Sequence, residues 1–204
     1  PIFAHLPFVM GQDNAKLSKR NGEVSIAWYR EQGFLPEAIC NYLALLGWSP
    51  GDDKENITMA ELVELFTVER VNSSPAKFDL KKLEAINGDK IRALKLDEFL
   101  ERSLPFLLDA KVITGSADEI KVVKSALPII QERIINLAEI PQMLNFLFVK
   151  DFTVSPQELP KILDDASQQV LKVALAKVES LTTWDHLSIE SVLRKALIDD
   201  LGLK

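Results

Sequence analysis

Residues 16–20 read Lys-Leu-Ser-Lys-Arg and place three cations and a hydroxyl group within five positions. Turn-forming residues flank this stretch, because residues 11–14 begin with glycine and residues 21–22 are Asn-Gly. A mobile loop that carries ammonium groups to a phosphate can stabilise the negative charge that develops there during a reaction. The same composition also describes a solvated basic turn. The surrounding sequence must decide between the two interpretations.

The charge of the whole chain is acidic, whereas one interval is basic. The 204 residues carry a net charge of -6, which argues against a general binder of polyanions, because affinity for phosphates grows with the number of lysines and arginines in contact. A local surface for a polyanion is still compatible with this balance. The basic interval contains Arg70, Lys77, Lys81, Lys82, Lys90, Arg92 and Lys95.

Cysteine, histidine and hydropathy patterns restrict the remaining classes of protein. One cysteine, Cys40, makes no internal disulfide, and two distant histidines suggest no zinc site, so we expect no metal site and a reducing, cytoplasmic location. We expect Cys40 to be a small core residue of a helix. The apolar runs are too short to span a bilayer, so we expect no membrane association.

Helix signals recur along the chain from about residue 36 onward. Pro36 opens the first helix, and capping boxes at residues 58–61, 116–119 and 155–158 open others. Asn87-Gly88 is a plausible helix stop, and the proline-containing stretches 104–109 and 154–160 are candidate hinges. Residues 2–10 alone favour a buried strand. The predicted fold is mainly all-α, with a short strand and loop at the N-terminus.

The sequence of residues 16–20 resembles the Lys-Met-Ser-Lys-Ser loop of class I aminoacyl-tRNA synthetases. Further segments resemble consecutive blocks of bacterial glutamyl-tRNA synthetases, densely from residue 3 to about residue 92 and more loosely beyond. These segments are residues 3–7, 29–31, 33–38, 41–48, 70–79 and 82–88. Two positions depart from the family, because Asn21 replaces a usual histidine and Ala85 replaces a common tryptophan.

The resemblance implies a ligase of protein biosynthesis that joins glutamate to its tRNA through an ATP-derived glutamyl-adenylate. Lys19 is then the ATP contact, Ser18 is a hydrogen-bond donor, and Lys16 and Arg20 add charge or hold the loop closed. ATP would act with Mg²⁺ in the full-length enzyme. The second class I signature, His-Ile-Gly-His or a close variant, does not occur here. We therefore expect a C-terminal fragment that is not catalytic alone.

The resemblance also assigns the contacts with glutamate tRNA. Cations of the basic interval are candidates for the tRNA stem, and Arg133, expected on a helix, is the candidate for reading the last anticodon base. An isolated helix arginine is also commonly a solvated surface charge, and this alternative stays open. The stem candidates are Lys77, Lys81, Lys82 and Arg92.

The implied architecture has three parts and a helical anticodon-binding cage. Residues 1–95 would comprise the end of the class I catalytic domain, with the Lys-Leu-Ser-Lys-Arg loop and the helical stem-contact region. Residues 96–155 would form the first anticodon-binding subdomain, and residues 156–204 the start of a second, truncated one. We expect a monomer. The alternative is a non-catalytic helical RNA-binding or protein-interaction module descended from a synthetase.

Overall fold

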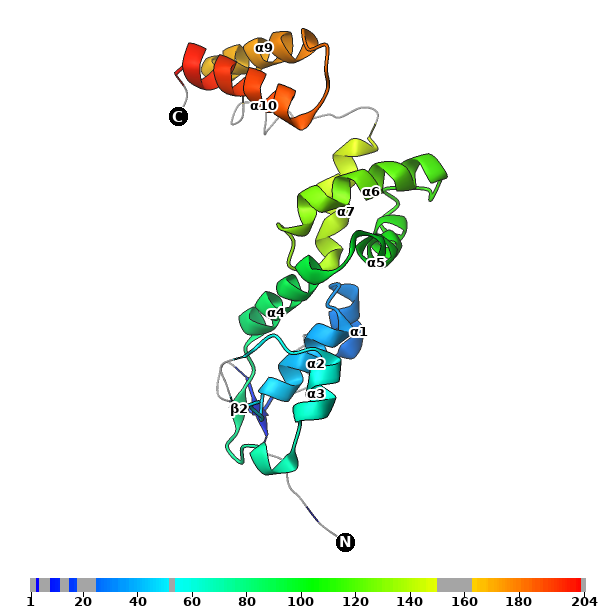
Figure 1. The fold of residues 1–204 in the computed structure, drawn as a ribbon, viewed down its shortest axis with the longest axis vertical. Helices are drawn as coiled ribbons and strands as arrows, with labels where there is room; N and C mark the ends of the chain where they lie inside the picture. The colour runs from blue at the N-terminus through cyan, green and yellow to red at the C-terminus, as the bar shows by residue number, and fades with distance from the viewer. Residues whose placement is uncertain are drawn as a thin grey trace. The chain divides into compact units, whose positions relative to one another are not determined.

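A computed structural model describes residues 3, 8–11, 15–17, 25–51, 54–149 and 163–202 of the chain. The chain divides into two compact units, Pro1–Val149 and Lys150–Lys204, and each is described by itself. Helices account for most of both units, and the described residues contain a single two-stranded sheet (Figure 1). The predicted mainly all-α fold with a short N-terminal strand is therefore confirmed.

The sheet of the first unit pairs two very short strands. β1 (Val9–Met10) runs parallel to β2 (Ala76–Lys77), so the strand expected over residues 2–10 is confined, among the described residues, to two positions. The amide of Leu17 donates to the carbonyl of Val9 at 2.9 Å, and this bond closes the base of the N-terminal loop. Lys16 and Leu17 therefore lie beside β1, which pairs with β2.

Three helices and a 3-10 turn follow the N-terminal loop. They are α1 (Ile26–Glu31), α2 (Pro36–Leu45), α3 (Met59–Leu65) and η2 (Val68–Arg70). Pro36 occupies the first turn of α2, as predicted, and Thr58 with Glu61 forms the predicted capping box of α3. The fully buried Asn41 joins α2 to the segment before α3, because its side chain bonds the carbonyl of Glu55 and the amide of Ile57, both at 2.9 Å.

The long helix α4 (Leu80–Ala93) packs against α2 and leads from β2 to the next group of helices (Figure 1). Its N-cap is Asp79, whose side chain accepts the amide of Lys82 at 3.2 Å. The predicted stop at Asn87-Gly88 is wrong, because both residues lie inside α4. Tertiary hydrogen bonds of the Asn87 side chain keep this polar residue in the helix interior.

The remaining helices of the first unit pack onto one another and share its core. They are α5 (Leu96–Asp109), α6 (Ala117–Gln131), η3 (Leu137–Glu139), α7 (Ile140–Leu144) and η4 (Asn145–Leu147). The capping box of Ser116 and Glu119 is confirmed. The hinge expected at residues 104–109 is wrong, because Pro105 lies within the continuous helix α5. One hydrophobic cluster extends from Tyr29 to Leu144.

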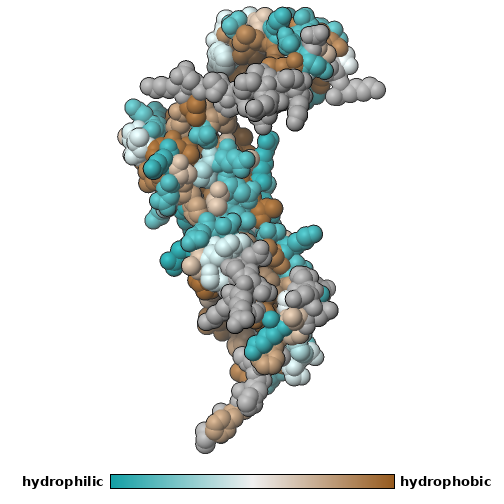
Figure 2. All heavy atoms as spheres, turned by 180° about the vertical axis from the view of Figure 1, so that it is seen from behind, coloured by the Kyte–Doolittle hydropathy of each residue, from teal (hydrophilic) through white to brown (hydrophobic). Residues whose placement is uncertain are grey.

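The second unit is described from residue 163 to residue 202. It contains α9 (Asp165–Glu179), α10 (His186–Arg194) and the π-helical segment η5 (Lys195–Asp200). The expected capping box at residues 155–158 and the expected hinge at residues 154–160 lie outside the described residues. Leu171, Leu175 and Leu187 leave more than half of their surface exposed, and apolar patches are visible on this unit in Figure 2. No helix in the described part of the chain has the length and apolar character needed to cross a membrane.

Candidate nucleic-acid interface

Lys16 is the one member of the predicted loop site within the described residues. Ser18, Lys19 and Arg20 lie outside them. Lys16 forms an antiparallel bridge with Met10, which places it beside β1. Its ammonium nitrogen lies 4.0 Å from the centroid of the exposed Phe8 ring, where the ring face attracts a cation. Lys16 is thus exposed and held at the base of the loop.

The four cations predicted to contact a tRNA stem lie on β2 and α4. Lys77 ends β2 and Lys81 lies in the first turn of α4, and both side chains are exposed. Neither has an ion-pair partner among the residues that the structure describes. Lys82 pairs with Glu55 at 2.6 Å, and Arg92 pairs with Asp89 at 2.5 Å. These ion pairs are at the surface, so a stronger anion can displace the carboxylates at small cost.

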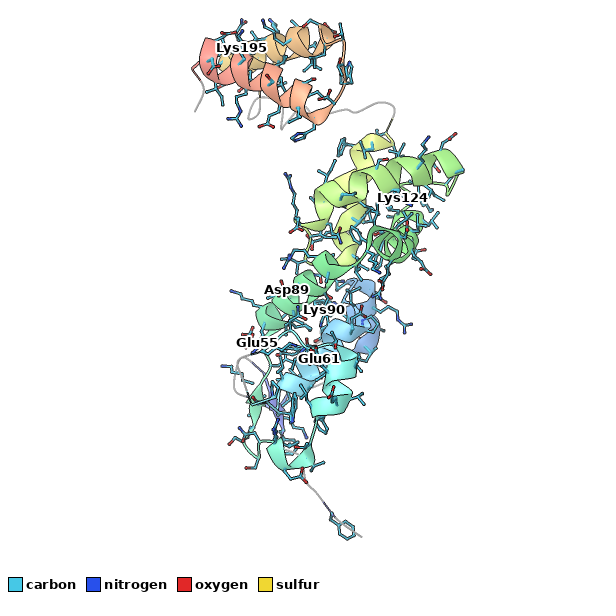
Figure 3. All side chains as sticks on the ribbon, viewed as in Figure 1. Glu55, Glu61, Asp89, Lys90, Lys124 and Lys195 are labelled. Atoms are coloured by element: carbon cyan, nitrogen blue, oxygen red, sulfur yellow. The ribbon has the colours of Figure 1, made fainter. Side chains whose placement is uncertain are left out.

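Gly88 brings the guanidinium group of Arg92 close to the backbone of α4. A Cβ atom at Gly88 would lie 3.2 Å from both terminal nitrogens of Arg92. The glycine therefore leaves room for the guanidinium to approach the helix backbone and to pair with Asp89, which is labelled in Figure 3. Arg92 is thus held in place before any anion binds.

Lys90 belongs to the same basic interval in the sequence but not to the same surface. Its side chain is buried, and its ammonium group donates to the carbonyl of Ile57 at 2.8 Å. Burial lowers the pKa of Lys90, while the charges of Glu37, Glu61 and Asp89 oppose this shift (Figure 3). Lys90 therefore joins α4 to the segment before α3 and is not available to a polyanion.

Arg133 lies in a turn and not in a helix, which corrects the expectation from the sequence. Helix α6 ends at Gln131, and the backbone amide of Arg133 donates to the carbonyl of Ile130 at 2.8 Å. The Arg133 side chain is exposed, whereas Ile134 is completely buried. The described part of the chain offers Arg133 no ion-pair partner. Its guanidinium is therefore exposed and, as far as the described ranges extend, accessible to an external acceptor.

Two residues of this region make tertiary contacts that the sequence did not predict. Asn87 was interpreted as part of a helix stop, yet its buried side chain bonds segments 48 and 52 positions away. Gly33 has a positive φ of 80° and lies against the backbone of η3. A glycine after α1 and an asparagine inside a helix are weak local signals, because both also occur at turns and helix ends.

Cys40 is exposed, so its predicted place in the core is wrong. The residues of α2 that face the core are Ala38, Asn41 and Tyr42. Cys40 instead lines a largely apolar cavity of about 560 Å³ between α2 and α5, beside the ion pair of Glu37 with Arg102 at 2.6 Å. Among the described residues, no three potential ligands from histidine, cysteine, aspartate or glutamate gather into a metal site.

Comparison with protein families divides the chain at about the place where α4 meets α5. Residues 1–85 match the family described as "tRNA synthetases class I (E and Q), catalytic domain". Residues 98–204, more than half of the chain, match the family described as "Anticodon binding domain". The chain belongs to this anticodon-binding family, and the resemblance to glutamyl-tRNA synthetases is confirmed.

The chain is similar over its whole length to proteins named glutamate–tRNA ligase. The chain is 43% identical over 207 residues to the glutamate–tRNA ligase of Saccharopolyspora erythraea and 44% identical over 206 residues to that of Rhodococcus jostii. All of this chain is covered, and it spans 41% and 42% of those two proteins. A crystal structure of a glutamate tRNA ligase from Elizabethkingia meningosepticum superimposes with a TM-score of 0.78 at 24% identity. The superposition covers 100% of this chain and 43% of the chain in that crystal structure. At this level of identity it supports the fold alone.

Proposed function

We propose that this chain is the C-terminal, tRNA-binding part of a glutamate–tRNA ligase. The complete enzyme would join glutamate to glutamate tRNA through a glutamyl-adenylate made from ATP. The observation that supports this most strongly is the 43% identity to such a ligase over the entire chain. The match to the catalytic family precedes the match to the anticodon-binding family along the chain, which agrees with this proposal. The chain itself would supply the ATP loop and the tRNA-binding surface.

We further propose that three segments of the chain have different functions. Residues 1–95 would carry the loop and the stem contacts, residues 96–155 the first anticodon-binding subdomain, and residues 156–204 the start of the second. The parallel pairing of β1 with β2 supports the first assignment, because β1, the strand before the loop, lies beside the strand that leads into α4.

In the activation step, the carboxylate of glutamate attacks the α-phosphate of ATP, and the bond to the bridging oxygen breaks. The pyrophosphate that leaves gains negative charge, which the ammonium group of Lys19 would stabilise. Ser18 would donate a hydrogen bond, and Arg20 would add positive charge. The contact of Lys16 with Phe8 would hold the base of the loop, so that closure moves its tip. Mg²⁺ would act with ATP in the complete enzyme.

The stem of the tRNA would lie along β2 and α4. Lys77 and Lys81 would bind phosphates directly, while Lys82 and Arg92 would exchange their carboxylate partners for phosphates. The exposed guanidinium of Arg133 presents only donors. At the Watson–Crick edge of an unpaired base it would therefore favour cytosine, which offers the acceptors O2 and N3, over guanine, which offers N–H donors there. Arg133 would thereby read the last anticodon base.

Substitution of Lys19 tests the proposed activity. In the complete ligase, Lys19→Ala should lower the rate of glutamate attachment about a hundredfold or more, because one preorganised cation no longer meets the transition state. The matched control is Lys111→Ala, which removes a lysine after α5, far along the chain from the loop. An unchanged rate for Lys19→Ala, measured by tRNA charging, would remove the role proposed for this lysine. Absence of charging by the complete unsubstituted protein would favour a non-catalytic RNA-binding module.

Binding of tRNA tests the recognition role of Arg133. Transcripts of glutamate tRNA that end the anticodon in C or in G should bind with a ratio of affinities that Arg133→Ala lowers by roughly fivefold or more. Filter binding of the 204-residue chain gives this ratio. Equal losses for both transcripts would show that Arg133 is a general phosphate contact or a solvated charge.

A further inference from the structure

Asn87 is completely buried in the middle of α4, and its side chain bonds two other segments. Its carbonyl oxygen accepts the amide of Leu35 at 2.8 Å, immediately before α2. Its amide nitrogen donates to the carbonyl of Ile135 at 2.7 Å and to the side-chain oxygen of Asn136 at 3.0 Å. Asparagine is a weak helix former and costly to bury, so neither the helix nor the core by itself favours it here.

The segment that Asn87 holds is the turn that carries Arg133. This turn, residues 132–136, is fixed at its start by Gln131, whose amide nitrogen donates to the carbonyls of Ile91 and Leu94 at 2.9 Å each. It is fixed at its end by the amide of Leu137, which donates to the carbonyl of Gly33 at 3.2 Å. Asn87 acts between these two points. The Arg133 turn is therefore bound to α4 by Asn87 and Gln131, and the residue that follows it is bound to the segment before α2.

We propose that Asn87 is a positioning residue for tRNA recognition, which holds the Arg133 turn at a set place on α4. This inference rests on the proposed function of the chain. The outer face of the same helix carries Lys81 and Arg92, the proposed stem contacts. One buried carboxamide thus fixes the reader of the anticodon base relative to the helix that holds the stem. A guanidinium that shifts by about an ångström loses its alignment with a base edge, since hydrogen bonds weaken steeply with angle.

Substitution of two equally buried asparagines distinguishes an effect on the position of the Arg133 turn from a general loss of stability. Asn87→Ala removes the bonds from the Asn87 side chain to Ile135 and Asn136, whereas Asn41→Ala removes a carboxamide that is equally buried but bonds Glu55 and Ile57 instead. Asn87→Asp has nearly the same shape and keeps an acceptor for Leu35, but it loses both donated bonds and buries a carboxylate beside two acceptor oxygens, so it is the more disruptive variant. All variants are measured at a temperature where circular dichroism shows them folded.

The expected result has two independent readouts. In the free 204-residue chain, Asn87→Ala and Asn87→Asp should speed hydrogen exchange of the amides of residues 134–137, and Asn41→Ala should not. With the C-ending and G-ending transcripts, both Asn87 variants should lower the affinity ratio by roughly fivefold, as Arg133→Ala does. The double variant Asn87→Ala with Arg133→Ala should discriminate no worse than Arg133→Ala alone.

The outcomes distinguish this inference from the proposed function. If Arg133→Ala lowers the ratio and the Asn87 variants do not, or if Asn41→Ala lowers it equally, Asn87 has no positioning role. If Arg133→Ala itself leaves the ratio unchanged, the recognition proposal fails, and with it the tRNA part of the present one. Unchanged hydrogen exchange in both Asn87 variants would overturn the inference whatever the RNA shows.

Discussion

Replacement of Gly33 by alanine should destabilise the first unit severely. The residue has a φ of 80°, and an added Cβ would lie 2.6 Å from the backbone nitrogens of both Leu137 and Ala138. The left-handed conformation costs alanine about 1–2 kcal/mol, overpacking costs about 1–3 kcal/mol, and loss of the bond from Leu137 costs about 1 kcal/mol. We expect the free energy of unfolding to fall by about 3–6 kcal/mol.

Alanine substitutions at two other glycines measure the cost of the left-handed conformation apart from the cost of overpacking. Gly115 also has a positive φ, 91°, but the nearest atom to its added Cβ is a side-chain carbon of Leu108 at 3.4 Å, so Gly115→Ala should cost only about 1–2 kcal/mol. Gly47 has open space around it and no positive φ, so Gly47→Ala should be neutral or stabilise by up to about 1 kcal/mol.

Urea unfolding followed by tryptophan fluorescence measures all three changes. Trp28 and Trp48 report on the first unit, where Trp48 is buried, while Trp184 of the second unit is already 68% exposed and changes little. If Gly33→Ala costs no more than Gly115→Ala, the close approach to η3 does not constrain this position. The account of the junction between residues 33–35 and η3 would then be wrong.

Three further predictions concern charge. Hydrogen bonds from Thr114 and Ser116 lower the pKa of Glu119 from 4.5 to about 2, so its stabilising effect is present above pH 4.5 and is lost as the pH falls towards 2. The difference in urea midpoint between the wild type and Glu119→Gln should shrink over that range, and a constant difference would contradict this account. Burial lowers the pKa of Lys90, so the unfolded chain binds this proton more strongly and stability rises with pH up to the ordinary value of 10.5. Lys90→Met should flatten that rise in an alkaline unfolding series, and an unaltered slope would exclude Lys90 as its source. Lys81→Ala should weaken binding of both tRNA transcripts alike and reduce the slope of log affinity against log salt by about 0.7–0.9, measured by filter binding at several salt concentrations.

Local hydrogen bonding made much of the fold predictable from the sequence. The capping boxes at Thr58 and Ser116 depend on a glutamate three positions later, and Pro36 suits the first turn of a helix by its own geometry. Such pairs lie within one helical turn, so their spacing in the sequence equals their spacing in space. The role of the loop at residues 16–20 was accessible only through resemblance, because five residues do not specify a nucleotide partner.

Tertiary packing decided which polar residues are buried and which remain exposed on the surface. Lys90 and Arg92 are two positions apart in one basic interval, yet one is buried against Ile57 and the other lies on the surface. Asn87 reads locally as a helix stop, but partners 48 and 52 positions away satisfy its side chain and allow α4 to continue. The sequence by itself determined where helices begin and where cations concentrate. Only the tertiary structure decided which of these side chains are buried and which are exposed, because burial and hydrogen bonding depend on segments that folding brings together.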